Sequence, residues 1–123
     1  MPSVLVVDVA NVMGSRPDGW WHDRAGAARR LADEVSTGQP TDQEVVLVLE
    51  GAARSGMPVT SGDSVRVVHA PGDGDDTVVA QTQALREQGR QVTVVTADRV
   101  LRDRVVALGA ECRGPRWLLD RLT

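Results

Sequence analysis

The sequence lacks lysine, phenylalanine and tyrosine, so all fourteen of its basic residues are arginine. Its one cysteine, Cys112, excludes an internal disulfide bond, and its two histidines, His22 and His69, do not have the spacing of a structural zinc site. No apolar run approaches the roughly 18 residues of a membrane span, and the first residues show no basic region or cleavage site of a secretory signal. We therefore expect a protein that resides in the cytoplasm and has no membrane partner.

The composition is that of a folded domain. Of the 123 residues, 41% are hydrophobic and 25% are charged, which excludes a disordered or fibrous chain. This length suits one domain that spans residues 1–123 and has a single core. The formal net charge of −3 argues against a surface coated in basic residues for duplex DNA, although local groups of arginine could still hold phosphates.

Continuous apolar runs alternate along the chain with helical patterns. Such runs are typical of strands buried on both faces of a parallel sheet, and apolar residues three or four positions apart mark the buried face of a helix. The predicted strands are Val4–Val7, Val45–Leu49, Val65–Val68, Val92–Thr96 and a short edge strand, Ala110–Cys112. The predicted fold is therefore an α/β domain, a three-layer α/β/α sandwich around a mainly parallel sheet of about five strands.

The predicted helices lie between these strands. One covers residues 23–35 with Asp23 as its cap, one leads from Thr77 to Gly89, one begins at Asp98, and a short one begins at Pro115. Their apolar faces comprise Ala25, Ala28, Leu31, Ala32 and Val35; Val78, Val79, Thr82 and Leu85; and Val100, Leu101, Val105 and Leu108. The stretch Gly51–Asp63, which is rich in glycine and serine, is predicted to be a long surface loop.

Acidic side chains follow three of the predicted strands. Asp8 comes directly after the first strand, Asp75 and Asp76 follow the third, and Asp98 follows the fourth, with Asn11 close to Asp8 in sequence. In such sheets ligands bind beyond the carboxyl ends of the strands. Carboxylates that meet there repel one another unless a cation joins them. The pattern therefore favours a metal-dependent active site.

Each acid could also have an ordinary structural role. Asp75, Asp76 or Asp98 could cap the helix that it begins or interact with the helix dipole. Asp8 is harder to account for in this way, because it follows four buried aliphatic residues and no helix is predicted to start beside it. The joint occurrence of these acids is the argument for a site.

Mg²⁺ or Mn²⁺ is the cofactor that suits such a group of carboxylates, because these hard ions take oxygen ligands. A bound ion lowers the pKa of a water molecule, which can then attack a phosphodiester. The sequence contains no Ser-His-Asp or Cys-His arrangement and no phosphate-binding loop of glycine and lysine. No protein nucleophile is therefore expected.

Three segments show a family resemblance: Val6–Val12, Gly74–Val79 and Val94–Arg99. They resemble the signature segments of NYN domains, the YacP-like branch of the PIN-like nucleases, and the tail from Leu108 to Leu119 is also similar to that branch. The resemblance covers nearly the whole chain, although each segment is short. It implies a sheet ordered 3-2-1-4-5, a Mg²⁺ or Mn²⁺ site, and endonucleolytic cleavage of single-stranded RNA.

The resemblance also implies roles for individual residues. Asp8, Asp76 and Asp98 would be the principal metal ligands or the acids that position the attacking water, and Asp75 would assist them. Asn11 would orient Asp8 or contact the substrate.

The chain departs from the family pattern in one place. Some relatives have another acid four residues after the aspartate of strand four, where this chain has Arg102 with Asp103 one position later. The fourth ligand is therefore not identified from the sequence. Thr96 and Asp103 are expected to hold the metal-binding acids in position without binding the ion themselves.

Residues outside the acidic group could contact RNA. Arg99 and Arg102 are close to Asp98 in sequence and are candidates for binding phosphates, although an exposed helix face accounts for them equally. Trp20 and Trp21 could stack on the bases of a single strand. They could instead pack a loop against the core or line a homodimer contact.

Two other functional classes stay open. One is a catalytically silent PIN-like domain that binds RNA or a protein partner, and the other is a different Mg²⁺-dependent phosphohydrolase, either Toprim-like or directed at nucleotides. A phosphoacceptor receiver domain is excluded because it needs a lysine, and a haloacid-dehalogenase-like phosphatase would need an aspartate where Ala10 stands.

Overall fold

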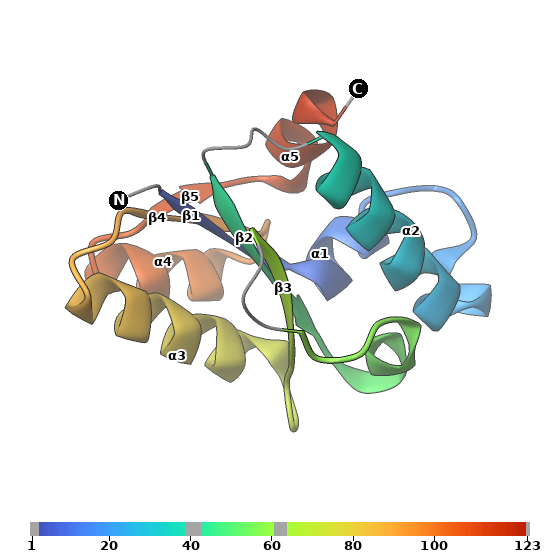
Figure 1. The fold of residues 1–123 in the computed structure, drawn as a ribbon, viewed down its shortest axis with the longest axis horizontal. Helices are drawn as coiled ribbons and strands as arrows, with labels where there is room; N and C mark the ends of the chain where they lie inside the picture. Colours follow the sequence, from blue (N-terminus) through green and yellow to red (C-terminus); the bar gives the residue numbers. More distant parts are fainter. Residues whose placement is uncertain (1–2, 39–42, 61–63, 123) are drawn as a thin grey trace.

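Five parallel strands form the sheet at the centre of the molecule, in the order β3-β2-β1-β4-β5 (Figure 1). The computed structural model describes residues 3–38, 43–60 and 64–122. The strands are β1 (Val4–Asp8), β2 (Glu44–Leu49), β3 (Val65–His69), β4 (Val92–Val95) and β5 (Glu111–Arg113). The predicted parallel sheet, its number of strands and their order are thus confirmed.

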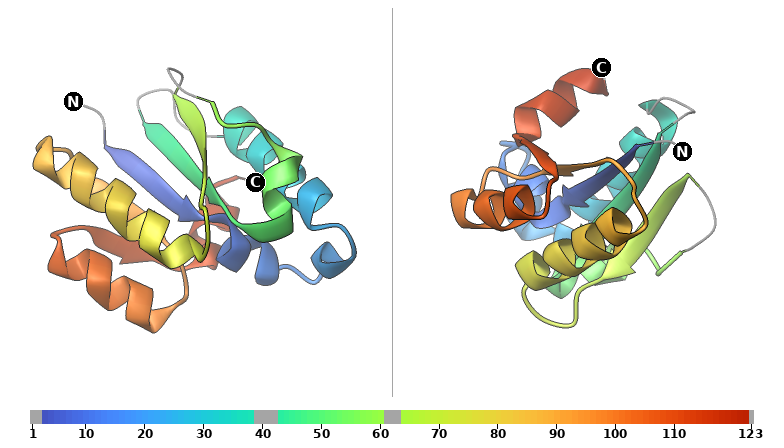
Figure 2. Two further views of the ribbon diagram at one scale, coloured as in Figure 1. Left: turned by 90° about the horizontal axis from the view of Figure 1, so that it is seen from below. Right: turned by 90° about the vertical axis from the view of Figure 1, so that its left-hand side faces the viewer.

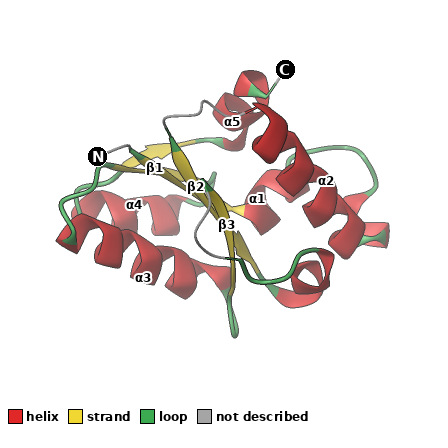
Figure 3. Cartoon of the chain, in the orientation of Figure 1, coloured by secondary structure: helices red, strands yellow, loops and turns green. Residues whose placement is uncertain are grey.

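Helices cover both faces of this sheet (Figure 3). The α-helices are α1 (Val9–Gly14), α2 (Arg24–Gly38), α3 (Gly74–Glu87), α4 (Arg99–Ala107) and α5 (Pro115–Arg121), and two short 3₁₀ helices are η1 (Trp20–His22) and η2 (Gly51–Gly56). Helices α1, α2 and α5 lie on one face, and α3 and α4 lie on the other. The predicted three-layer α/β/α architecture is confirmed.

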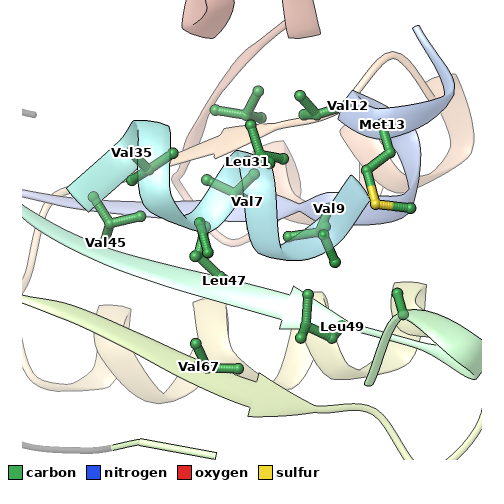
Figure 4. Close-up of a cluster of buried hydrophobic side chains, with 14 of the residues drawn as sticks. Val7, Val9, Val12, Met13, Leu31, Val35, Val45, Leu47, Leu49 and Val67 are labelled. Atoms are coloured by element: carbon green, nitrogen blue, oxygen red, sulfur yellow. The ribbon is translucent and has the colours of Figure 1, made fainter. Parts of the chain in front are cut away.

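Alternate residues of each central strand supply the two halves of the core. In β1, Leu5 and Val7 pack with α1, α2 and α5, whereas Val4 and Val6 pack with α3 and α4. Figure 4 shows the first of these clusters, in which Leu31 of α2 lies over Val7. Because both faces are covered, the inner strands are mostly apolar, which is why the sequence shows aliphatic runs such as Val4–Val7 and Val45–Leu49.

The ends of the helices follow local rules. The carboxylate of Asp23 accepts a hydrogen bond from the N–H of Gly26 (2.9 Å) at the start of α2, and Pro115 occupies the first turn of α5. Helix α3 ends at Glu87, two residues before Gly89, whose φ of 78° lies in the left-handed region, and the N–H of Arg90 bonds to the carbonyl of Leu85 (3.1 Å). The predicted cap of α2 and the predicted end of α3 are confirmed.

Two local expectations were wrong. A helix, α1, does start beside Asp8, because Val9, Val12 and Met13 lie at helical spacing and are buried against α2. The stretch after β2 is not an irregular surface loop throughout, since η2 occupies its first six residues and buries Ala53. Residues 61–63 of the predicted loop lie outside the described residues.

Four side chains that were assigned to apolar helix faces are not fully buried: Val100 is exposed, and Ala25, Val79 and Leu108 are half-buried. Val100 is 69% exposed because it lies in the first turn of α4 on the side away from the sheet, where Leu101 and Val105 make the contact. Ala25 is only half-buried at the start of α2. Within the described residues, no helix is both long enough and apolar enough to cross a membrane.

Candidate active site

The carboxyl ends of β1 and β4 bring Asp8 beside Thr96. Val7 pairs with Val95 in the register of the two strands, so the residues that follow them are level. The hydroxyl of Thr96 donates a hydrogen bond to Oδ2 of Asp8 (3.0 Å) and accepts one from the N–H of Asp98 (3.2 Å). One buried hydroxyl thus links two of the acids that were predicted to form the site.

Asn11 connects α1 to the same turn. Its Oδ1 accepts a hydrogen bond from the N–H of Ala97 (2.8 Å), which lies between Thr96 and Asp98. This contact holds the turn after β4 against α1. Asn11 therefore holds the turn that carries Asp98 in place. Its side-chain nitrogen can still contact a ligand.

Glu50 is an acidic residue at this edge that sequence reasoning missed. It follows the last residue of β2, and its negative charge is near enough to raise the pKa of both Asp8 and Asp75. The signal was present in the sequence, because Glu50 follows an apolar run just as Asp8 does. Applying the same rule to β2 would have found it.

Helix α3 begins against the side chain of Glu50. A Cβ atom added at Gly74 would lie 2.7 Å from Oε1 of Glu50, closer than such atoms normally approach. The absence of a side chain at Gly74 therefore leaves room for the Glu50 carboxylate beside the start of α3. Figure 2 shows α3 beginning beside the carboxyl end of β1.

Burial gives Asp8 unusual acid–base properties. Asp8 is only 5% exposed, and this burial is the main reason that the pKa of its carboxyl group rises from 3.8 to about 6. The hydrogen bond from Thr96 and the backbone amide of Asn11 oppose the rise, whereas the charges of Asp75 and Glu50 add to it. A nearby cation would stabilise the charged form of a carboxylate that is buried in this way.

Asp75 belongs to the same electrostatic group. Burial is the main cause of its raised pKa, and the negative charges of Asp73, Asp98 and Glu50 raise it further, while Arg104 lowers it. Asp75 does not cap α3, because that role belongs to Asp73, whose carboxylate accepts from the N–H of Asp75 (2.9 Å). Asp75 is thus left with its carboxylate among the other acids.

Asp76 is placed differently from its neighbour. Its side chain is 82% exposed and accepts a hydrogen bond from Nη2 of Arg104 on α4 (3.1 Å). The acids whose charges raise the pKa of Asp8 and Asp75 are instead Asp73, Asp75, Asp98 and Glu50. From the sequence, Asp76 was expected to be a principal ligand and Asp75 its assistant. The structure places Asp75 in the acidic group and pairs Asp76 with Arg104, and their roles as ligands stay a prediction.

Asp98 serves two purposes at once. Its Oδ1 caps α4 by accepting from the N–H groups of Val100 (2.9 Å) and Leu101 (3.1 Å), which is the ordinary structural role considered for this residue. Its charge also raises the pKa of Asp75, so the cap lies within reach of the acidic group. Capping occupies one oxygen, which leaves the other for a ligand.

The acids converge without forming a closed metal centre. The charges of Asp75 and Glu50 raise the pKa of Asp8, and those of Asp98 and Glu50 raise the pKa of Asp75. Yet across residues 3–38, 43–60 and 64–122 no three side chains of Asp, Glu, His or Cys are already gathered closely enough to hold a metal ion. The ligand set predicted from the sequence therefore stays a prediction.

The other predicted contact residues surround this group or lie apart from it. Arg99 and Arg102 are exposed on α4, and Asp103 pairs with Arg102 (3.7 Å) rather than supporting the acids. Trp20 packs against the core, while Trp21 is 54% exposed and meets it edge-on with 5.9 Å between ring centroids. Trp21 is thus the member of the pair that is available to a partner.

The fold and the position of the acids place the chain in a structural class. A parallel sheet of order 3-2-1-4-5 between two helical layers is the PIN-like α/β/α architecture, and the acids lie at the carboxyl edge where ligands bind in such sheets. No family model and no curated protein sequence matches the chain.

Solved structures give a particular comparison. Two crystal structures of Rae1 (YacP) from Bacillus subtilis share the fold, each at 21% sequence identity. The W164L mutant superimposes with a TM-score of 0.69, and the match covers 98% of this chain and 74% of that one. The other structure gives a TM-score of 0.68 and covers 98% and 73%. At this level of identity the likeness shows a common fold.

Proposed function

We propose that this protein is a metal-dependent endoribonuclease that cleaves single-stranded RNA. The observation that supports this most strongly is the buried Asp8, which lies among the like charges of Asp75 and Glu50 at the edge of the sheet where ligands bind. The shared fold with Rae1 (YacP) agrees with the YacP-like sequence segments described above.

The donor set fits Mg²⁺ or Mn²⁺. These ions commonly use one or two carboxylates and complete their shell with water and with phosphate oxygens of the substrate, so a loose group of acids suits them. Asp8, Glu50, Asp75 and Asp98 would hold the ion. When bound, it would lower the pKa of a water molecule and offset charge that develops on the phosphate.

Three side chains would position the acids or attract the substrate. Thr96 fixes the orientation of the Asp8 carboxylate by donating to its Oδ2, and Asn11 holds the adjacent turn in place. Arg99 lies next to Asp98 and is exposed, and its side chain makes no hydrogen bond or ion pair with the described residues. A cation in this position would attract the RNA phosphates that the acids repel.

Cleavage of a labelled single-stranded RNA tests the proposal. The wild-type protein should cut the RNA with Mn²⁺ and should not cut it in EDTA. Asp98→Asn should abolish cleavage with little loss of thermal stability, because asparagine caps a helix about as well as aspartate does. Asp103→Asn is the matched control, since Asp103 is an exposed acid on the same helix.

Other outcomes would decide against the proposal. Cleavage that persists in EDTA or in Asp98→Asn would contradict a metal-dependent reaction at these acids. Binding of RNA without turnover, with Mn²⁺ present, would favour the catalytically silent domain.

A further inference from the structure

A groove of about 540 Å³ lies beside the acidic group, between α1 and α5. Its walls comprise Ala10, Asn11 and Gly14 from α1, Ala97 from the turn after β4, and Pro115 and Arg116 from α5. The lining is mostly apolar, and its size falls in the range of about 300–1,000 Å³ that is typical of pockets for small organic groups.

The groove is continuous with the candidate active site. Ala97, which forms one wall, lies between Thr96 and Asp98 in the turn that carries the acids. Asn11 also lines the groove, and its Oδ1 accepts a hydrogen bond from the N–H of Ala97. A ligand in the groove would therefore lie next to a phosphate at the acids.

Asn11 offers the groove a hydrogen-bond donor. The partner at Ala97 is an N–H group, so the side-chain oxygen of Asn11 must face it and the amide nitrogen must lie on the other side. This nitrogen makes no hydrogen bond within the described part of the chain. It can donate to the edge of a ligand in the groove.

Arg116 gives the groove a planar cation at its rim. It pairs with Asp120 one helical turn later (3.2 Å), but its side chain is 87% exposed, and ion pairs of this kind are weak. A guanidinium plane can leave such a pair to stack on a nucleobase. A phosphate alone would not match a groove that is mostly apolar.

We propose that this groove holds the base of a nucleotide adjacent to the cleaved phosphodiester of a single-stranded RNA. The inference rests on the proposed function and adds a subsite to it. An apolar trough with one planar cation and one amide donor suits an unstacked base, whose faces are apolar and whose edge accepts hydrogen bonds.

A groove-filling variant tests this subsite through binding rather than activity. In an Asp8→Asn background with Mg²⁺, which prevents cleavage, fluorescence anisotropy would measure the affinity for a six-nucleotide RNA. The same RNA with one abasic position, moved along the strand, would identify the base that matters. Ala10→Leu fills the groove, and Ala84→Leu, on the exposed surface of α3 across the sheet, is the matched control.

The expected result is a loss that depends on the base. Loss of one stacked base should weaken binding about 5- to 150-fold, and Ala10→Leu should weaken binding of the intact RNA by a similar factor. The abasic RNA should show no further loss with Ala10→Leu, whereas Ala84→Leu should bind both RNAs as the parent does. Arg116→Lys should lose part of the base-dependent affinity, because lysine keeps the charge but not the plane.

Two results would overturn the inference, and they are distinguishable. The first is that Ala10→Leu leaves RNA binding unchanged, or that its loss of affinity adds to the loss from every abasic position. Either finding would show that no base occupies the groove, while the proposed function stands. An absence of RNA binding by the parent protein would overturn the proposed function and the subsite together.

Discussion

The two ends of the central sheet differ in whether their charged side chains have partners of opposite charge. At the amino end, the nearly buried guanidinium of Arg90 pairs with Glu44 (3.2 Å), and Arg86 donates to the backbone carbonyls of Leu108 (3.2 Å) and Arg90 (2.8 Å). At the carboxyl end, Asp8 is surrounded by further acids, and burial and like charge both raise its pKa. Charge is compensated at one end and left uncompensated at the other.

This difference separates the structural role of the amino end from the function that we propose for the carboxyl end. The pairs at the amino end fix the positions of strands and helices and need no further partner. The acids at the carboxyl end oppose folding on their own, and such groups are found where a ligand or a reaction requires them. The contrast between the two ends yields four predictions.

The largest expected effect is on cleavage, and it separates Asp75 from Asp76. Asp75→Asn should reduce the cleavage rate about 10²- to 10⁴-fold, because Asp75 belongs to the acidic group. Asp76→Asn should stay within about threefold of wild type, since its side chain is exposed and bonded to Arg104. Initial rates on a labelled RNA with Mn²⁺ measure both, and the opposite ranking would restore Asp76 as the principal acid.

The second effect is a dependence of stability on pH that comes from Asp8. Its pKa in the folded protein, about 6, exceeds its ordinary value of 3.8, so the folded state holds the proton more tightly and stability falls as pH rises from about 4 to about 6. The difference corresponds to roughly 3 kcal/mol over that range. Urea unfolding in EDTA measures it.

Asp8→Asn removes this titrating group. The variant should lose most of the fall in stability between pH 4 and 6 and should be more stable than wild type at pH 7.5, because a neutral amide replaces a buried charge. Asp103→Asn, which alters an exposed acid, should keep the wild-type slope. An unchanged slope in Asp8→Asn would show that the charge of Asp8 is already compensated.

The third effect tests the close approach of α3 to β2. Gly74→Ala should displace the carboxylate of Glu50, because the new Cβ would lie 2.7 Å from Oε1, and cleavage should fall about 10- to 100-fold. Gly72→Ala is the control, since nothing lies within 4 Å of a Cβ at that position. Equal rates for the two variants would show that the position of Glu50 does not matter to the reaction.

The smallest effect belongs to the amino end of the sheet. Glu44→Gln should lower the free energy of unfolding by about 1 kcal/mol, because Glu44 is partly exposed while its partner Arg90 is nearly buried. Cleavage should not change. Glu111→Gln, in an exposed pair with Arg113, should alter neither quantity, and a loss of cleavage in Glu44→Gln would contradict the separation of the two ends.

The sheet could be predicted from the sequence because its strands are buried on both faces. Unbroken aliphatic runs such as Val45–Leu49, short and rich in valine, are typical of buried parallel strands, and the order of the strands followed from the family resemblance. Helix α1 was missed because it is only six residues long and directly follows a strand, so its apolar residues extend the run of β1.

The acidic group was predicted in part. Asp8 and Asp98 follow strands, and the structure places both at the same edge. The choice between Asp75 and Asp76 depends on the direction in which each side chain leaves the first turn of α3, which adjacent positions in a sequence do not reveal. Glu50 required only that the rule used for Asp8 be applied to every strand.

The missing side chain at Gly74 has a consequence for how this site can evolve. Glycine at position 74 and glutamate at position 50 are sterically coupled, because a Cβ atom at the first would displace the carboxylate of the second. The two positions should therefore change together among relatives. A lineage that gains a side chain at position 74 would be expected to carry aspartate or a smaller residue at position 50.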